Sequence, residues 1–138
     1  MSTKEIKALC RRFAEEVNKG EAAAMAVMDE MFSPDFIFHS GTGEDVHGLE
    51  VFKKQNSEFF RACPDLHFSI DDMIVEGDKV ATRWTLTGTQ KGAFAGIPAT
   101  NKKRTISALY IDRLAGGKFA EEWERYDTLG MMQQLGLK

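Results

Sequence analysis

The chain has 138 residues, of which 43% are hydrophobic and 28% charged, with a formal net charge of −3. This composition is typical of one globular domain over residues 1–138 and excludes a disordered chain. With no concentrated basic stripe and no run of about 20 apolar residues, we expect neither a nucleic-acid nor a membrane partner. No signal-peptide core is present near the start, so we expect a cytoplasmic protein, with Cys10 and Cys63 as buried reduced thiols.

The first half of the chain predicts three helices and one strand. Ser2 and Glu5 have capping-box spacing, and a helical period of apolar residues follows them. A second helix is predicted over Glu21–Phe32 and a short strand over Asp35–Ser40. A third helix is predicted over Leu49–Cys63, and prolines follow the second and third helices and end them.

After the third helix the apolar period changes from 3.6 to 2, which is typical of strands. Turn signals divide this region into four predicted strands: Leu66–Ile74, Lys79–Thr89, Arg104–Arg113 and Lys118–Tyr126. Asp72 interrupts the apolar alternation of the first of them, and indicates either a pocket acid or a strand irregularity. The segment Leu129–Leu135 could form a short closing helix.

Helices on one side of an antiparallel meander define an α+β architecture. A strongly curved sheet leaves a concave face, and a pocket forms where the helices cover that face incompletely. The sequence therefore predicts a cone with a pocket for a small apolar molecule.

Several common site types are missing from the sequence. The three histidines are scattered, and no CxxC pair, phosphate-binding glycine loop or GxSxG motif is present. We therefore expect no metal and no cofactor, and look for chemistry among acids and polar residues on strands.

Glu121 is the first candidate for a catalytic group. Strict alternation along Lys118–Tyr126 puts Phe119, Glu121 and Trp123 on one face of the strand. A carboxylate between two aromatic rings would be desolvated, which raises its pKa and suits a general base. The alternative is that Glu121 belongs to a solvated run of acids.

Two further polar residues could assist. Arg83 lies in the middle of a strand and needs a partner, which could be Asp71, Asp72 or Glu121, or it could polarise a substrate oxygen. His39 lies beside a glycine loop, where it could donate a hydrogen bond or shuttle a proton, or lie at a pocket rim without a role.

Aromatic residues are candidates for the pocket wall. Trp84 and Trp123 are either core or flat walls for a flat ligand. Phe59, from the apolar stripe of the third helix, is also placed among the ligand-pocket residues.

Much of the chain resembles the SnoaL-like polyketide cyclase (ester cyclase) family of the NTF2-like superfamily. The matching motifs are EGDKV, RWT, GT-x-x-G, G-I-P-x-T, I-D-R, G-K-x-x-E-x-W and the terminal D-T-L-G-x-x-x-Q-L-G. The helical half is similar too, with Pro34-Asp35-Phe36 and with His39 ahead of Gly48.

The resemblance implies an NTF2-like cone of three helices on a curved, mostly antiparallel sheet, and a homodimer. It implies cofactor-independent aldol ring closure of a small polyketide-like substrate, started by an acidic side chain that removes a proton from carbon. Glu121 matches the position of that acid, and Asp127 is the other candidate. The Arg-x-Asp strand of the related limonene epoxide hydrolases matches Arg83-x-Thr85 here, which lacks the aspartate but suggests that Arg83 and Thr85 face the pocket.

Two functions follow from this reading. The first is a cyclase or isomerase with Glu121 as base and His39 or Arg83 as hydrogen-bond donors. The second is a non-catalytic homodimer that binds a small apolar ligand, because this fold hosts both functions. The direction in which Glu121 points separates them.

Overall fold

A computed structural model describes residues 1–41, 43–94 and 96–136 of the chain. Four helices are present: α1 (Thr3–Val17), α2 (Glu21–Met31), α3 (Leu49–Ala62) and α4 (Thr128–Gln134). The six strands are β1 (Phe32–His39), β2 (Val46–His47), β3 (His67–Glu76), β4 (Lys79–Thr89), β5 (Lys103–Ala115) and β6 (Lys118–Tyr126). The α+β prediction is confirmed, and so is the closing helix, while the short strand β2 was not predicted.

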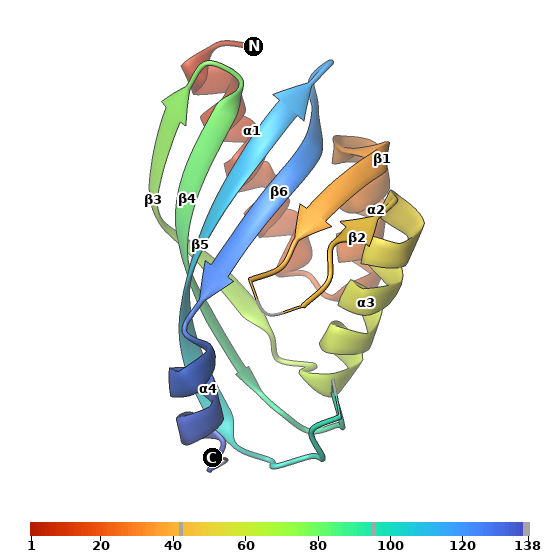
Figure 1. Ribbon diagram of the computed structural model, residues 1–138, viewed down its shortest axis with the longest axis vertical. Coiled ribbons are helices and arrows are strands. Elements are labelled where there is room, and N and C mark those ends of the chain that lie inside the picture. Colours follow the sequence, from red (N-terminus) through yellow and green to blue (C-terminus); the bar gives the residue numbers. More distant parts are fainter. Residues whose placement is uncertain (42, 95, 137–138) are drawn as a thin grey trace.

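The strands form one sheet in the order β2-β1-β6-β5-β4-β3. All neighbours are antiparallel except β1 and β6, which run parallel. Helices α1 to α3 cover one face of this sheet, and α4 lies beside β5 at the end opposite the N-terminus (Figure 1). The long, bent strands and the helices enclose the cone that the sequence predicted.

Local sequence signals explain the first helix. Ser2 and Glu5 form the predicted capping box, in which each side chain bonds the other's backbone N–H. The face of α1 that packs inward consists of Ile6, Cys10, Ala14 and Val17. Cys10 and Cys63 are both buried free thiols, as predicted. Within the described residues, no helix is long and apolar enough to cross a membrane.

Phenylalanines dominate the core between the helices and the β1 end of the sheet. Phe36 is fully buried, and its ring lies 4.7 Å from that of Phe32 and 4.8 Å from that of Phe52. Phe32 also contacts Phe119 on β6 at 5.2 Å. This cluster fixes β1 against β6, the strand that carries the acids.

Two β-bulges change which side chains face the helices. On β6, Phe119 pairs with Leu114 and Glu121 with Arg113, so Ala120 is an extra residue without a partner in β5. On β3, Ile70 pairs with Trp84 and Asp72 with Arg83, so Asp71 is extra. The irregularity suspected at Asp72 is therefore real and lies one residue earlier.

Candidate functional site

A cavity of about 420 Å³ lies between the concave face of the sheet, the helices and the loop after β4. Its volume is in the range of pockets for small organic ligands. Eight phenylalanine rings supply much of its wall: Phe13, Phe32, Phe38, Phe52, Phe59, Phe60, Phe68 and Phe94. At the end of the cavity beside α4 the wall is made by Met131, Met132 and Leu135.

Two carboxyl groups on β6 enter this apolar cavity. Glu122 and Glu124 line it, together with Tyr110 and Tyr126. Residues two apart on a strand face the same side, about 7 Å from each other. A ligand in the cavity can therefore contact both carboxyl groups at once.

Glu122 forms a buried pair with Asp112 on the neighbouring strand. The two residues are register partners, and their carboxyl groups are hydrogen-bonded to each other. Burial raises the pKa of Asp112 to about 6, and burial together with the charge of Asp112 raises the pKa of Glu122 well above its usual value. The pair therefore holds a proton to higher pH than an exposed carboxyl group does, and the stronger rise is at Glu122.

Glu124 has a different environment, although it is only two residues away. Burial raises its pKa, while a hydrogen bond with the Tyr110 side chain opposes that shift. Burial and nearby carboxylates raise the pKa of Tyr110, so its hydroxyl keeps its proton and donates to Glu124. Glu124 is thus a desolvated carboxylate held by a neutral donor, which suits a general base.

The pH dependence of stability tests the buried pair. Asp112 has a higher pKa in the folded protein than in the unfolded chain, where aspartate titrates near 3.9. The folded state then binds more protons, so the free energy of unfolding falls as pH rises from about 4 through 6. We expect Asp112→Asn to remove about 2–3 kcal/mol of this fall, measured by urea unfolding between pH 4 and 8.

Glu121→Gln is the matched control for that experiment. The hydrogen bond from His39 lowers the pKa of Glu121, so its contribution is present above the unfolded pKa and lost as pH falls through the folded one. This variant should leave the fall between about pH 5 and 6 intact, and should change stability above about pH 6, because Glu121 raises the pKa of His39. An Asp112→Asn protein with the full wild-type fall would contradict the assignment of a raised pKa to Asp112.

Glu121 itself lies outside the cavity, contrary to the expected placement. Its carboxylate bonds His39 Nε2 at 2.6 Å and Arg113 Nε at 3.1 Å on the outer face of the sheet. The physical reason is the extra residue at Ala120, which breaks the alternation after Phe119 and turns Glu121 outward. Its pKa is lowered by the His39 bond, not raised by burial.

His39 and Trp123 belong to the same outer cluster. The imidazole stacks on the Trp123 ring at 5.1 Å, and its Nδ1 lies 3.0 Å from Asp45 Oδ2. Bonds to Glu121 and Asp45 raise the pKa of His39. The predicted neighbourhood of His39 and Glu121 is therefore present, but on the face opposite the cavity.

The remaining predicted site residues are scattered. Arg83 and Thr85 face outward, where the Thr85 hydroxyl donates to Asp71 at 2.6 Å and the Arg83 guanidinium lies 3.7 Å from the same carboxylate. Trp84 is buried in the core and is not among the described lining residues. Asp127 caps α4 by accepting from the Gly130 N–H. Phe59 lines the cavity.

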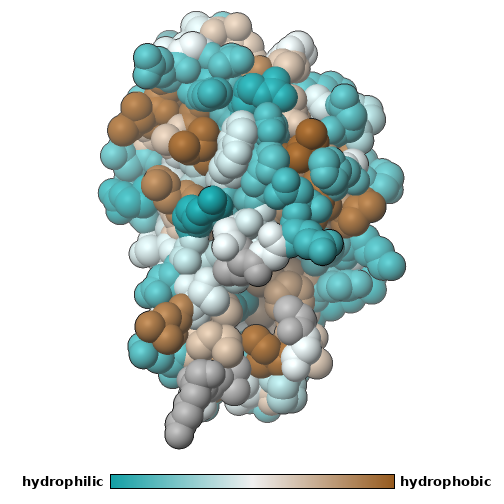
Figure 2. Space-filling model, in the orientation of Figure 1, coloured by the Kyte–Doolittle hydropathy of each residue, from teal (hydrophilic) through white to brown (hydrophobic). Residues whose placement is uncertain are grey.

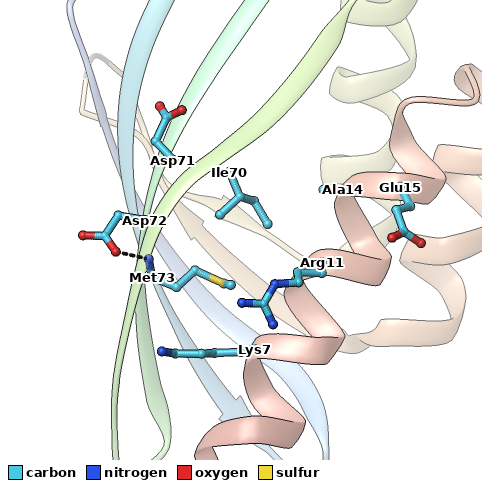
Figure 3. Close-up of a pocket in the computed structure, with 8 residues that line it drawn as sticks. All are labelled: Lys7, Arg11, Ala14, Glu15, Ile70, Asp71, Asp72 and Met73. Atoms are coloured by element: carbon cyan, nitrogen blue, oxygen red, sulfur yellow. Dashed lines mark hydrogen bonds between the residues drawn. The ribbon is translucent and has the colours of Figure 1, made fainter.

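A second hollow lies between α1 and β3. Figure 3 shows Lys7 and Arg11 reaching from the helix toward the strand, with Ile70 and Met73 facing them. Asp71 and Asp72 point to the other side of β3, and Asp72 accepts from the Met73 N–H at 2.9 Å. Acids and bases do not converge in this hollow, so the cavity with Glu122 and Glu124 is the candidate active site.

Sequence reasoning did not select Glu122, Glu124 or Tyr110. A signal was present in the segment FAEEWERY, where the acids at 122 and 124 alternate with Trp123 and Arg125. The alternation does group 122 and 124 with Tyr126, on the face opposite to the one that it gives to Phe119 and Glu121. Only the bulge decides that this face is also the face of Phe119.

Comparisons with known proteins place this geometry in context. The family described as "SnoaL-like polyketide cyclase" matches residues 8–135. Aklanonic acid methyl ester cyclase DauD from Streptomyces sp. (strain C5) is 24% identical over 131 residues, covering 93% of this chain and 80% of DauD.

Solved structures of similar proteins superpose on nearly the whole chain. TsrD from Streptomyces laurentii superposes with a TM-score of 0.87 and is 28% identical, covering 100% of this chain and 99% of TsrD. A candidate SnoaL-like polyketide cyclase from Jannaschia sp. CCS1 also has a TM-score of 0.87, with 26% identity, and covers 99% of this chain and 94% of its own.

Proposed function

Since this chain belongs to the SnoaL-like polyketide cyclase family, we propose that it closes a ring in a small polyketide-like substrate by cofactor-independent aldol chemistry. The observation that carries the proposal is the pair of carboxyl groups on one face of β6. Glu122 and Glu124 share an apolar cavity, and burial raises the pKa of Glu122 well above its usual value while a Tyr110 hydrogen bond opposes the rise at Glu124. Two carboxyl groups with separated pKa values are a common basis for general acid–base catalysis.

The substrate suited to this site has a carbon flanked by two carbonyl groups. Such a carbon acid needs only one desolvated base, and Glu124 is placed to remove its proton. The C–H bond breaks, the proton goes to Glu124, and the electron pair passes into an enolate. Once Glu124 holds this proton it no longer needs the Tyr110 hydroxyl as a donor, and that hydroxyl can then donate to the enolate oxygen.

Ring closure completes the reaction without any change of oxidation state. The enolate carbon attacks a second carbonyl carbon of the same substrate, so that a C–C bond forms as the π bond of that carbonyl breaks. The new alkoxide then takes the proton from protonated Glu124, which restores the base. Substrate and product are isomers. The apolar walls exclude water, which strengthens these interactions and protects the enolate.

The assay for this proposal uses a trial substrate from the relative's name. Aklanonic acid methyl ester, the compound named for DauD, is incubated with the protein and the ring-closed isomer is separated by chromatography. Formation of the isomer above the uncatalysed rate supports the proposal. Absence of closure with this ester and with simpler 1,3-dicarbonyl compounds would contradict it.

Non-catalytic binding of a small apolar ligand is the second candidate function. The aromatic walls of the cavity favour it, because they would hold a flat molecule whether or not a reaction follows. Saturable binding of a ring-closed product by a protein that catalyses neither proton exchange at carbon nor ring closure would favour this candidate.

We also propose that the protein is a homodimer through the outer face of the sheet. A row of residues paired between neighbouring strands of the sheet crosses this face: Ile74, Ala81, Ile111 and Trp123. Ile74 is 66% exposed and Ile111 40% exposed, and Figure 2 shows apolar side chains gathered over the upper parts of β3 to β5. Apolar patches on a sheet face are candidate protein interfaces.

The prediction is that Ile111→Glu weakens this dimer at least about tenfold, because it places a charge in the apolar row. Analytical ultracentrifugation over a range of protein concentrations measures the dissociation constant. Val51→Glu is the control, since Val51 is also exposed, at 51%, but lies on α3, away from the sheet face. A wild-type protein that sediments as a monomer would overturn the dimer proposal.

A further inference from the structure

Arg104 is a buried arginine that lines the cavity. It lies at the start of β5, faces inward, and is only 6% exposed. Its register partner on β4 is Gly88, which has no side chain to pair with the guanidinium. Buried arginines normally have a carboxylate partner, because desolvating a charge is costly.

The contacts of this guanidinium are weak ones. Nη1 donates to Met131 Sδ at 2.7 Å and Nη2 lies 3.5 Å from Cys63 Sγ. The Phe59 ring lies 5.1 Å from the guanidinium carbon. Among the ion pairs of the described residues, none involves Arg104. Thioether and thiol sulfur atoms are weak acceptors, so most of its five N–H donors lack a strong acceptor.

The cationic end of the cavity is remote from its acidic end. Arg104 and Tyr110 are six residues apart on β5, or about 20 Å along an extended strand. Glu124, the partner of Tyr110, therefore cannot neutralise Arg104. Gln90, the other buried polar residue here, already bonds the Ile97 and Pro98 carbonyls and the Thr100 hydroxyl, so it does not supply an acceptor to Arg104.

We infer that Arg104 binds a carboxylate at one end of the ligand and thereby orients an apolar body toward Glu122 and Glu124. The planar guanidinium matches a carboxylate through two parallel N–H···O bonds, and such bonds are strong in a site that excludes water. The inference rests on the proposed function for the reaction at Glu122 and Glu124. The binding of a ligand carboxylate by Arg104 does not depend on that reaction. Arg104 is a positioning residue of the cavity.

A matched pair of ligands tests this inference by binding alone. The probes are 2-naphthylacetate and its methyl ester, which share the aromatic body and differ in the carboxylate. Their dissociation constants are measured at pH 7 by titration calorimetry. We expect the wild type to prefer the acid by about tenfold or more, and Arg104→Met to weaken the acid by roughly 10- to 100-fold while the ester changes less than about twofold.

Two variants control for folding. Arg12→Met removes the same group from the exposed side of α1, where Arg12 pairs with Glu30, and should leave both probes unchanged. Arg104→Lys keeps the charge but loses the planar fork, so it should retain part of the preference for the acid. Replacement of an unpaired buried charge by methionine should not lower the thermal unfolding midpoint.

Each outcome decides one claim. Equal binding of acid and ester by the wild type, or equal loss of both in Arg104→Met together with a lower unfolding midpoint, would overturn the carboxylate anchor. A preserved acid preference in a protein that performs no ring closure would leave the anchor standing and remove the proposed reaction. Ring closure by a wild type that shows no preference for the acid would support the proposed reaction and overturn the carboxylate anchor.

Discussion

Glu124→Gln is expected to lower the rate of ring closure by about 10²–10⁴-fold, the usual contribution of a positioned general base. The amide has nearly the same shape but cannot accept the proton from carbon. Glu124 lines the cavity, burial raises its pKa, and Tyr110 holds its carboxylate in place. The measurement is kcat/KM as a function of pH, which should rise through the pKa of Glu124 in the wild type and lose that rise in the variant.

Glu121→Gln is the control for this prediction. It is the same substitution three residues earlier on the same strand, in a carboxylate bonded to His39 and Arg113 outside the cavity. We expect its rate to stay within about threefold of wild type. The catalytic assignment of Glu121, His39 and Arg83 stays a prediction that this variant tests. A lower rate of ring closure in Glu121→Gln, with the wild-type rate in Glu124→Gln, would support that assignment.

Phe36→Ala is expected to lower the free energy of unfolding by about 3–5 kcal/mol, the range for truncating a large buried side chain. Phe36 is fully buried on β1, and its ring contacts those of Phe32 and Phe52. The loss combines the transfer of apolar surface with the cavity left behind. Urea unfolding followed by tryptophan fluorescence measures it, at constant slope against denaturant.

Val51→Ala is the matched control, since Val51 is 51% exposed on α3. Its effect should stay within about 0.5 kcal/mol, as for most surface substitutions. If Phe36→Ala lost no more than this control, the phenylalanine cluster would not be what holds β1 against β6.

Most elements could be predicted because their signals are local. The capping box at Ser2 marks a helix start, and the prolines after α2 and α3 mark helix ends. Both signals act on the backbone of residues that are close in the sequence. The change of period after residue 64 marks the strands in the same way. The two-residue strand β2 has no such signal, because its pairing with Ile37 and Phe38 depends on the whole sheet.

The site could not be predicted with the same success, because one unpaired residue decides it. Strict alternation grouped Glu121 with Phe119, and the bulge at Ala120 separates them. No feature of that alanine distinguishes it from its neighbours in the sequence. Trp123 was grouped on the wrong face for the same reason, and it stacks on His39 outside the cavity.

Arg83 and Thr85 were assigned to the cavity by resemblance, although the alternation of β4 puts Trp84 on the other face. In the structure Trp84 is buried while Arg83 and Thr85 share the carboxylate of Asp71. That contact depends on the second bulge, at Asp71. No local signal in the sequence marks Arg104 as buried, because its burial depends on α4 packing over the start of β5.

Proton exchange at a carbon acid tests the central claim, that the inward carboxylates of β6 enolise a bound carbonyl compound, without knowledge of the natural substrate. A naphthyl 1,3-diketone is incubated in D₂O with wild type, Glu121→Gln or Glu124→Gln, and loss of its central C–H signal is followed by NMR. We predict exchange above the buffer rate with wild type and Glu121→Gln, and no enhancement with Glu124→Gln. Enhancement that survives in Glu124→Gln and disappears in Glu121→Gln would contradict the account.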